Sequence, residues 1–205
     1  MAQEQSRFFD SVASDRQYAA EDFAEYFRTF LTSGVFEAGT NLQVSPSSGL
    51  VLAVGYGAAM LDGYGFWLKD DSTGVKTVSL VAANTLPRKD RIVVRLDKSV
   101  GTRLATIAVK TGTPAASPSA PALTRAGNIF EISLAVVAVG ANVLSISAGN
   151  ITDERTNNAV CGIVEPIRVR DYLNQSVKTT DSPTFASATI AGTLSANKVI
   201  GTVYQ

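Results

Sequence analysis

The sequence predicts a mainly β protein that begins with one amphipathic helix. From residue 41 onward, apolar residues alternate with a period of two. Turn residues recur at short intervals, and the Asp62-Gly63 pair between two apolar runs is a strong hairpin signal. Residues 17–31 instead follow the 3.6-residue period of a helix. We therefore expect an N-terminal helix, a β-sandwich or small-barrel domain, and an extended C-terminal tail that forms a trimeric stalk.

The expected helix carries an unusually aromatic face. Its apolar positions are Phe23, Tyr26, Phe27, Phe30 and Leu31. Asp15 fits the N-cap, and Gly34 fits a left-handed C-terminal cap. The aromatic face covers either a sheet of its own chain or a partner, and packing on its own sheet is the commoner arrangement for a single helix.

The β region is expected to consist of many short strands that end near Gly162. The expected strands are residues 50–54, 57–61, 65–69, 75–80, 90–96, 104–110, 128–139 and 145–151. Residues 112–121 are rich in Pro, Ala and Ser, which predicts an extended surface connector with polyproline character. Close spacing of short strands is typical of a sandwich or barrel.

Composition limits the classes of function. The 18 Lys and Arg residues balance the 18 Asp and Glu residues, so we expect no nucleic-acid binding. Apolar runs are too short to predict membrane insertion. The chain has no His and one cysteine, Cys161, which we expect to be a buried small apolar side chain. We expect no cofactor, no metal and no enzymatic activity.

Two clusters are candidate sites. In Asp153-Glu154-Arg155, adjacent side chains rarely converge on one substrate atom, so we expect a structural ion pair, preferably at a subunit interface. A wall-degrading hydrolase that uses Asp90, Asp97, Asp153 and Glu154 is the enzymatic alternative. The aromatic side chains of residues 64–67 can stack on a sugar ring, but core packing is the commoner role for such residues.

The last 25 or so residues are too poor in apolar side chains to fold alone. Their apolar positions include Phe185, Ile190, Leu194, Val199 and Ile200. Copies of the chain are therefore expected to meet around this tail, as a homo-oligomer and preferably a trimer. Together with Phe23, Tyr26, Phe27, Phe30, Asp153 and Arg155, these residues form the expected interface.

Three groups of motifs resemble phage tail proteins. FFDS at 8–11, DRQY at 15–18 and SGVF at 33–36 resemble the opening of baseplate and tail-fibre-associated proteins from phages of Gram-positive bacteria. ALTR at 122–125, FEISLA at 130–135 and ITDER at 151–155, with Cys161-Gly162, are similar to the same group. DSPTF at 181–185 and GTLSANKVIG at 192–201 resemble segments of trimeric tail fibres.

The resemblance implies a virion structural protein of a phage tail or baseplate, assembled in the host cytoplasm. Because the sequence ends at Gln205, soon after the fibre-like segment begins, an adaptor that anchors fibre or receptor-binding components fits better than a receptor-binding protein. The expected units are residues 1–36 for attachment, 37–162 for the β domain and 163–205 for linker and oligomerisation. The alternative is a carbohydrate-binding module that contacts the host cell surface.

Overall fold

The computed structural model describes residues 7–15, 17–70, 75–82 and 85–167, and it is mainly β with one short N-terminal helix. The expected stalk and its apolar residues, from Phe185 to Ile200, lie outside the described residues. The elements in chain order are α1 (Ala20–Arg28), β1 (Gly34–Val35), β2 (Val44–Pro46), β3 (Val51–Val54), β4 (Gly57–Leu61), β5 (Tyr64–Leu68), β6 (Lys76–Ser79), β7 (Arg88–Asp97), β8 (Leu104–Lys110), β9 (Arg125–Ala126), β10 (Ile129–Val139), the 3-10 turn η1 (Ala148–Asn150) and β11 (Ile151–Asp153).

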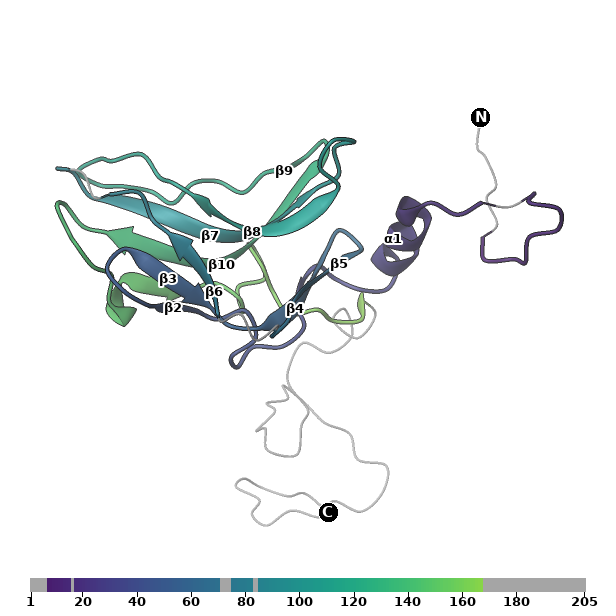
Figure 1. The fold of residues 1–205 in the computed structure, drawn as a ribbon, viewed down its shortest axis with the longest axis horizontal. Helices are drawn as coiled ribbons and strands as arrows, with labels where there is room; N and C mark the ends of the chain where they lie inside the picture. The colour runs from purple at the N-terminus through teal and green to yellow at the C-terminus, as the bar shows by residue number, and fades with distance from the viewer. Residues whose placement is uncertain (1–6, 16, 71–74, 83–84, 168–205) are drawn as a thin grey trace, which may run out of the picture.

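The strands form three antiparallel sheets. The largest has the order β11-β10-β7-β8, with β9 also paired to β10. Two three-stranded sheets, β2-β3-β6 and β1-β4-β5, lie on one side of it (Figure 1). Helix α1 extends this architecture at the end where the β4–β5 hairpin lies (Figure 1).

One apolar core joins the sheets. Leu52 of β3, Leu61 of β4, Ile92 of β7 and Ile132 of β10 are all completely buried and belong to one cluster. Strands β7 and β10 occupy the centre of the large sheet, and they are buried on both faces. This explains why the residues of β10 read as an almost continuous apolar run instead of an alternating one.

The outer face of the large sheet carries a buried carboxylate. Glu131 is fully buried and accepts hydrogen bonds from Lys110 Nζ at 2.6 Å, Arg95 Nη1 at 3.0 Å and the backbone N–H of Thr124 at 2.6 Å. Burial alone would raise the pKa of Glu131, but the hydrogen bonds from Lys110 and Thr124 and the charges of Lys110 and Arg95 outweigh it and hold the pKa below its ordinary value.

The Pro-rich connector runs along this outer face. It leaves β8 near the start of β7, where the N–H of Gly112 donates to Asp90 Oδ1 at 2.9 Å. It reaches Glu131 at Thr124, just before β9. Asp90 is itself fully buried and paired with Arg88 at 2.9 Å. The connector contains no helix or strand, and hydrogen bonds fix both of its ends to the sheet.

Three local expectations are wrong. Helix α1 starts at Ala20, and its N-cap is Ala19, whose N–H donates a hydrogen bond to the Asp22 carboxylate. Asp15 is therefore not the N-cap. Gly34 belongs to β1 and does not cap the helix. Residues 145–150 form no strand, because Asn150 accepts hydrogen bonds from the N–H and hydroxyl of Ser147 and closes the turn η1.

No helix in the described part of the chain is long and apolar enough to cross a membrane.

Replacing the buried carboxylate should destabilise the fold in a pH-dependent way. Glu131→Gln leaves Lys110 beside a neutral amide, and we expect a loss of about 3 kcal/mol in the free energy of unfolding near neutral pH. Because the native pKa of Glu131 lies below the ordinary 4.5, its contribution is complete above that pH and is lost as the pH falls through the native pKa. The difference between the two proteins should therefore shrink in acid.

Urea unfolding at several pH values measures this difference. Glu37→Gln, which changes an exposed glutamate, is the matched control and should alter stability by less than about 0.5 kcal/mol. A Glu131→Gln penalty that does not change with pH would contradict this account.

Candidate interaction surface

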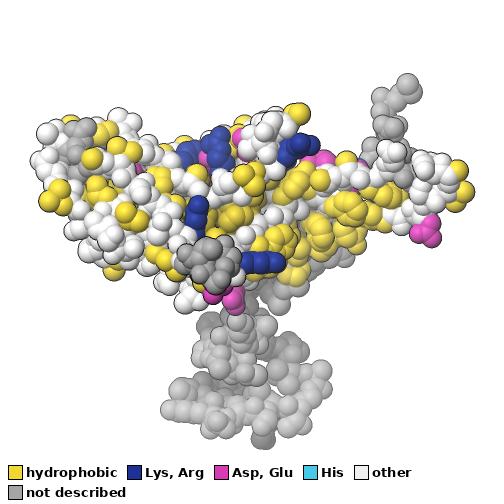
Figure 2. Space-filling view, viewed as in Figure 1, with side chains coloured by type: hydrophobic (Ala, Val, Ile, Leu, Met, Phe, Trp, Pro, Cys, Tyr) yellow, Lys and Arg dark blue, Asp and Glu magenta, His cyan; other side chains and the backbone are white. Residues whose placement is uncertain are grey.

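The aromatic face of α1 points away from the body of the protein. Phe23, Tyr26, Phe27 and Phe30 are between 37% and 50% exposed, and Ala24 is the buried residue of the helix. The expectation that this face packs on a sheet of its own chain is therefore wrong. Figure 2 shows apolar side chains gathered over α1 and β5.

The exposed rings touch one another along the helix. Phe8 packs on Phe23 and Tyr26, with ring centroids 5.4 Å and 5.0 Å away, and Phe30 packs on Tyr26 and Phe27 at 5.1 Å and 5.8 Å. These edge-to-face and tilted contacts make a continuous aromatic layer. We call these five residues, Phe8, Phe23, Tyr26, Phe27 and Phe30, the aromatic row.

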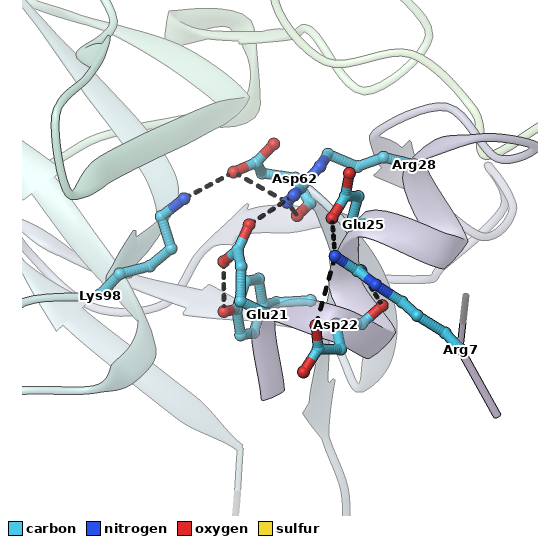
Figure 3. A network of polar contacts seen from close by, with 8 residues as sticks. Arg7, Glu21, Asp22, Glu25, Arg28, Asp62 and Lys98 are labelled. Atoms are coloured by element: carbon cyan, nitrogen blue, oxygen red, sulfur yellow. Dashed lines mark hydrogen bonds and ion pairs between the residues drawn. The ribbon is translucent and has the colours of Figure 1, made fainter. Parts of the chain in front are cut away.

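Segment 7–15 is held on α1 by Arg7. Its guanidinium pairs with Glu25 at 2.6 Å and Asp22 at 3.3 Å, and it also donates to the backbone oxygen of Asp22. These contacts, which appear in Figure 3, place the adjacent Phe8 on the helix. The FFDS motif therefore contributes to the aromatic row, a role that helical periodicity alone does not reveal.

The opposite side of α1 packs on the β4–β5 turn. Ala24 is 2% exposed and lies so close to Gly63 that a Cβ on Gly63 would stand 2.1 Å from the Ala24 oxygen. Asp62 and Gly63 both have positive φ angles, 49° and 80°. This matches the two-residue hairpin turn that the Asp-Gly pair predicts, and the absence of a side chain at Gly63 admits the helix backbone.

Charged groups fix α1 on this turn. Arg28 donates through Nη1 to the Asp62 backbone oxygen at 2.8 Å and pairs through Nη2 with Glu21, while Lys98 pairs with Asp62 at 2.8 Å (Figure 3). The Tyr64 hydroxyl donates to Glu21 at 2.8 Å. We call Glu21, Arg28, Asp62, Tyr64 and Lys98 the ionic clamp.

The contacts within the ionic clamp shift the pKa values of Glu21 and Tyr64. Burial would raise the pKa of Glu21, but its hydrogen bonds with Arg28 and Tyr64 lower it overall. Burial and the Glu21 carboxylate raise the pKa of Tyr64 to about 12. Glu21 therefore stays ionised as acceptor, and Tyr64 stays protonated as donor.

The last described residues run beside the end of α1. Thr32 N–H donates to the Glu165 oxygen at 3.0 Å, and Ile167 N–H donates to the Phe30 oxygen at 2.9 Å. Ile163 also forms a parallel bridge with Val35. Residues 163–167, the last that the structure describes, therefore lie beside the end of α1 and next to Phe30 of the aromatic row.

Arg155 acts within its own chain. It is 3% exposed and pairs with Asp153 at 2.6 Å, and its Nη1 donates to the backbone oxygens of Ala38, Gly39 and Asn41 at 3.2, 3.0 and 2.7 Å. The expected ion pair is present within the chain, where Arg155 fixes the loop between β1 and β2, and its expected place at a subunit interface stays a prediction. Only the half-exposed Asp153 side chain offers surface to a partner.

The carboxylates of the enzymatic alternative do not form one group. Asp90 and Asp97 lie near opposite ends of β7, roughly 23 Å apart at the rise of a strand. Asp90, Asp153 and Glu154 each pair with an arginine of the chain. Among the described residues, no group of three or more His, Cys, Asp or Glu side chains is placed to hold a metal ion.

Two residues singled out by sequence occupy different environments. Cys161 is 5% exposed, as expected, and burial raises the pKa of its thiol to about 12. Tyr64 and Phe66 pack partly against the core, but Trp67 is 61% exposed, so the expectation of core packing is wrong for Trp67.

No protein-family model matches the chain, and no curated protein matches it in sequence.

Because α1 packs on the β4–β5 turn, we expect a substitution at Gly63 to disturb the helix and a matched substitution at Gly127 to leave it in place. Gly63→Ala and Gly127→Ala both place a side chain at positive φ, which costs about 1–2 kcal/mol. Only the new Cβ at Gly63 meets the helix backbone, whereas a Cβ at Gly127 meets nothing within 4 Å. Gly63→Ala should therefore release α1 and speed amide hydrogen exchange in residues 24–28 at least tenfold.

Hydrogen exchange read by mass spectrometry measures this release. Gly127→Ala should leave exchange in α1 unchanged. Equal exchange of α1 in both variants would contradict the proposed seating of the helix.

Proposed function

We propose that this chain is a virion structural protein of a phage tail or baseplate, an adaptor that anchors fibre or receptor-binding components and works as a homo-oligomer, preferably a trimer. The observation that carries the proposal is the aromatic row, held outward on α1 by the ionic clamp. The phage setting rests on the resemblance of the three motif groups. The partners are other copies of the chain and further tail or baseplate proteins.

The size of the aromatic row fits the centre of a protein interface. Five aromatic side chains of about 200 Å² each, exposed to between 37% and 50%, leave roughly 400 Å² of ring surface in contact with water. A stable interface buries about 800 Å² on each partner. The aromatic row therefore supplies about half of such a surface.

The chemistry of the row also favours a permanent contact. Aromatic side chains are enriched at the buried centres of interfaces, where charged residues are depleted. The charges next to the row are already paired within the chain, Arg7 with Asp22 and Glu25, and Arg28 with Glu21 and Asp62. Burial of apolar surface, with little electrostatic steering, is the assembly mechanism that follows.

The oligomeric state of the purified chain tests the assembly step. Light scattering should give about three times the 21.6 kDa of one chain. Tyr26→Glu introduces a charge into the aromatic row and should weaken association at least tenfold, because the carboxylate would have to be buried. Leu144→Glu is the matched control, since Leu144 is 86% exposed and lies outside the row.

A chain that ends at Ile167 separates the tail from the helix. It keeps the hydrogen bonds of residues 163–167 to the end of α1, which a chain ending at Gly162 would lose. If the tail trimerises the protein, the shortened chain should be monomeric. A full-length chain that stays monomeric at high concentration would contradict the proposed assembly.

The place of the protein in the virion is a separate prediction. Phage particles purified on a density gradient from a producing culture should contain the chain, as measured by mass spectrometry. An antibody to the chain should label the tail in electron micrographs. Recovery of the chain only in the particle-free fraction would contradict a structural role.

A further inference from the structure

A groove lies beside the exposed Trp67. It has a volume of about 470 Å³ and is lined by residues of β5, by the ends of β7 and β8 where a turn joins them, and by Ala20 at the start of α1. Strand β5 is the edge strand of its sheet, so the groove is formed where this sheet stops. Its volume falls within the range of small-molecule sites.

The indole of Trp67 lies against Gly65 of the same strand. Three atoms of its six-membered ring lie over Gly65, and a Cβ on Gly65 would stand 2.3 Å from the nearest of them, Cη2. Because Gly65 has no side chain, the indole rests on the strand. The side chain is nevertheless 61% exposed, so a large part of the ring is open to solvent. This arrangement differs from a core tryptophan, which is enclosed by other side chains.

Polar groups of both kinds stand at the groove. Arg103 also lines it, and among the described residues no carboxylate pairs with its guanidinium. Asp97 lines the same groove, and its hydrogen bonds with Ser99 keep its pKa below the ordinary value, so it is an ionised acceptor. Lys98 and Tyr64 complete this wall but are already engaged with Asp62 and Glu21.

We propose that this groove binds a neutral pyranose unit of an oligosaccharide. The C–H face of a pyranose ring is apolar and can lie on the open surface of the Trp67 indole, while its hydroxyls act as both donors and acceptors. Arg103 supplies donors and Asp97 supplies an acceptor at the rim. The opposite charges of Arg103 and Asp97 balance, which favours an uncharged ligand over an acidic one.

This site is distinct from the aromatic row. The row uses the exposed rings of α1 and segment 7–15, whereas the groove uses β5 and the β7–β8 turn and includes only Ala20 from the helix. The two proposals therefore rest on different residues, and each can fail without the other.

Tryptophan fluorescence gives a direct test, because Trp67 is the one tryptophan of the chain. The full-length protein is titrated with neutral oligosaccharides of glucose, galactose, mannose, rhamnose and N-acetylglucosamine, and with a uronic-acid oligomer for comparison. At least one neutral oligosaccharide should shift the emission in a saturable way, and the uronic-acid oligomer should bind more weakly.

Variants assign the signal to the groove. Arg103→Ala keeps the fluorophore and should weaken binding at least fivefold, and Trp67→Ala should abolish binding on an array that carries the same sugars. Phe36→Ala removes an aromatic ring that is 43% exposed but lies outside the groove, and it should leave binding unchanged.

Several results would overturn the proposal. The first is no saturable shift with any neutral oligosaccharide up to millimolar concentration, and the second is full binding by Trp67→Ala. The third is Trp67 emission that acrylamide cannot quench in the full-length chain but can quench in a chain ending at Ile167, which would show that residues 168–205 fill the groove. Protection of Trp67 that increases with protein concentration would show that a second copy fills it.

Discussion

The contact between Ala24 and Gly63 determines which side of α1 is available to other molecules. A helix of nine residues has too few internal hydrogen bonds to be stable alone, so its orientation must come from packing. Packing at Ala24 buries the small residue and turns the aromatic row outward. The ionic clamp then limits rotation of the helix about its axis, because Glu21 and Arg28 lie on the same side as Ala24 and bind Tyr64 and Asp62.

The charged residues of this chain serve mainly its own architecture. Glu131 joins β10 to β8 and to the connector, Arg155 fixes the loop before β2, and the Arg88–Asp90 pair lies where the connector begins. Removing one partner of such a buried pair is costly because the other charge remains without compensation. These charged residues are paired within the chain, whereas the exposed face of α1 carries the aromatic row. Such an apolar surface suits assembly by burial of apolar area.

Patterns that depend on neighbouring residues could be predicted from the sequence. The helix, most strands and the Asp62-Gly63 turn follow from periodicity and turn chemistry, and the structure confirms them. The environment of a side chain depends on distant residues instead. Periodicity places Trp67 opposite Phe66 on β5, but only the arrangement of the sheets shows that the Trp67 side has no covering layer.

The same limitation explains the expectations that were wrong. The aromatic face of α1 has the pattern of a core-facing helix, and no local signal shows that Ala24 is the residue that packs. Ser147 and Asn150 could have indicated a turn in place of a strand, because their side chains compete for backbone hydrogen bonds. The backbone oxygens that accept hydrogen bonds from Arg155 lie more than 110 positions away, so spacing along the chain could not reveal them.

The clamp connects the two candidate surfaces physically. Tyr64 and Lys98 bind Glu21 and Asp62 to seat α1, and the same two side chains form part of the groove wall beside Trp67. Ala20, the first residue of α1, also lines the groove. A displacement of the helix would therefore change the shape of the groove, and a ligand that favours one seating of α1 would favour the corresponding orientation of the aromatic row. Because Glu21 and Arg28 lie on the helix that carries the aromatic row, while Tyr64 and Lys98 line the groove, any energetic coupling between the two surfaces has a short path through the clamp.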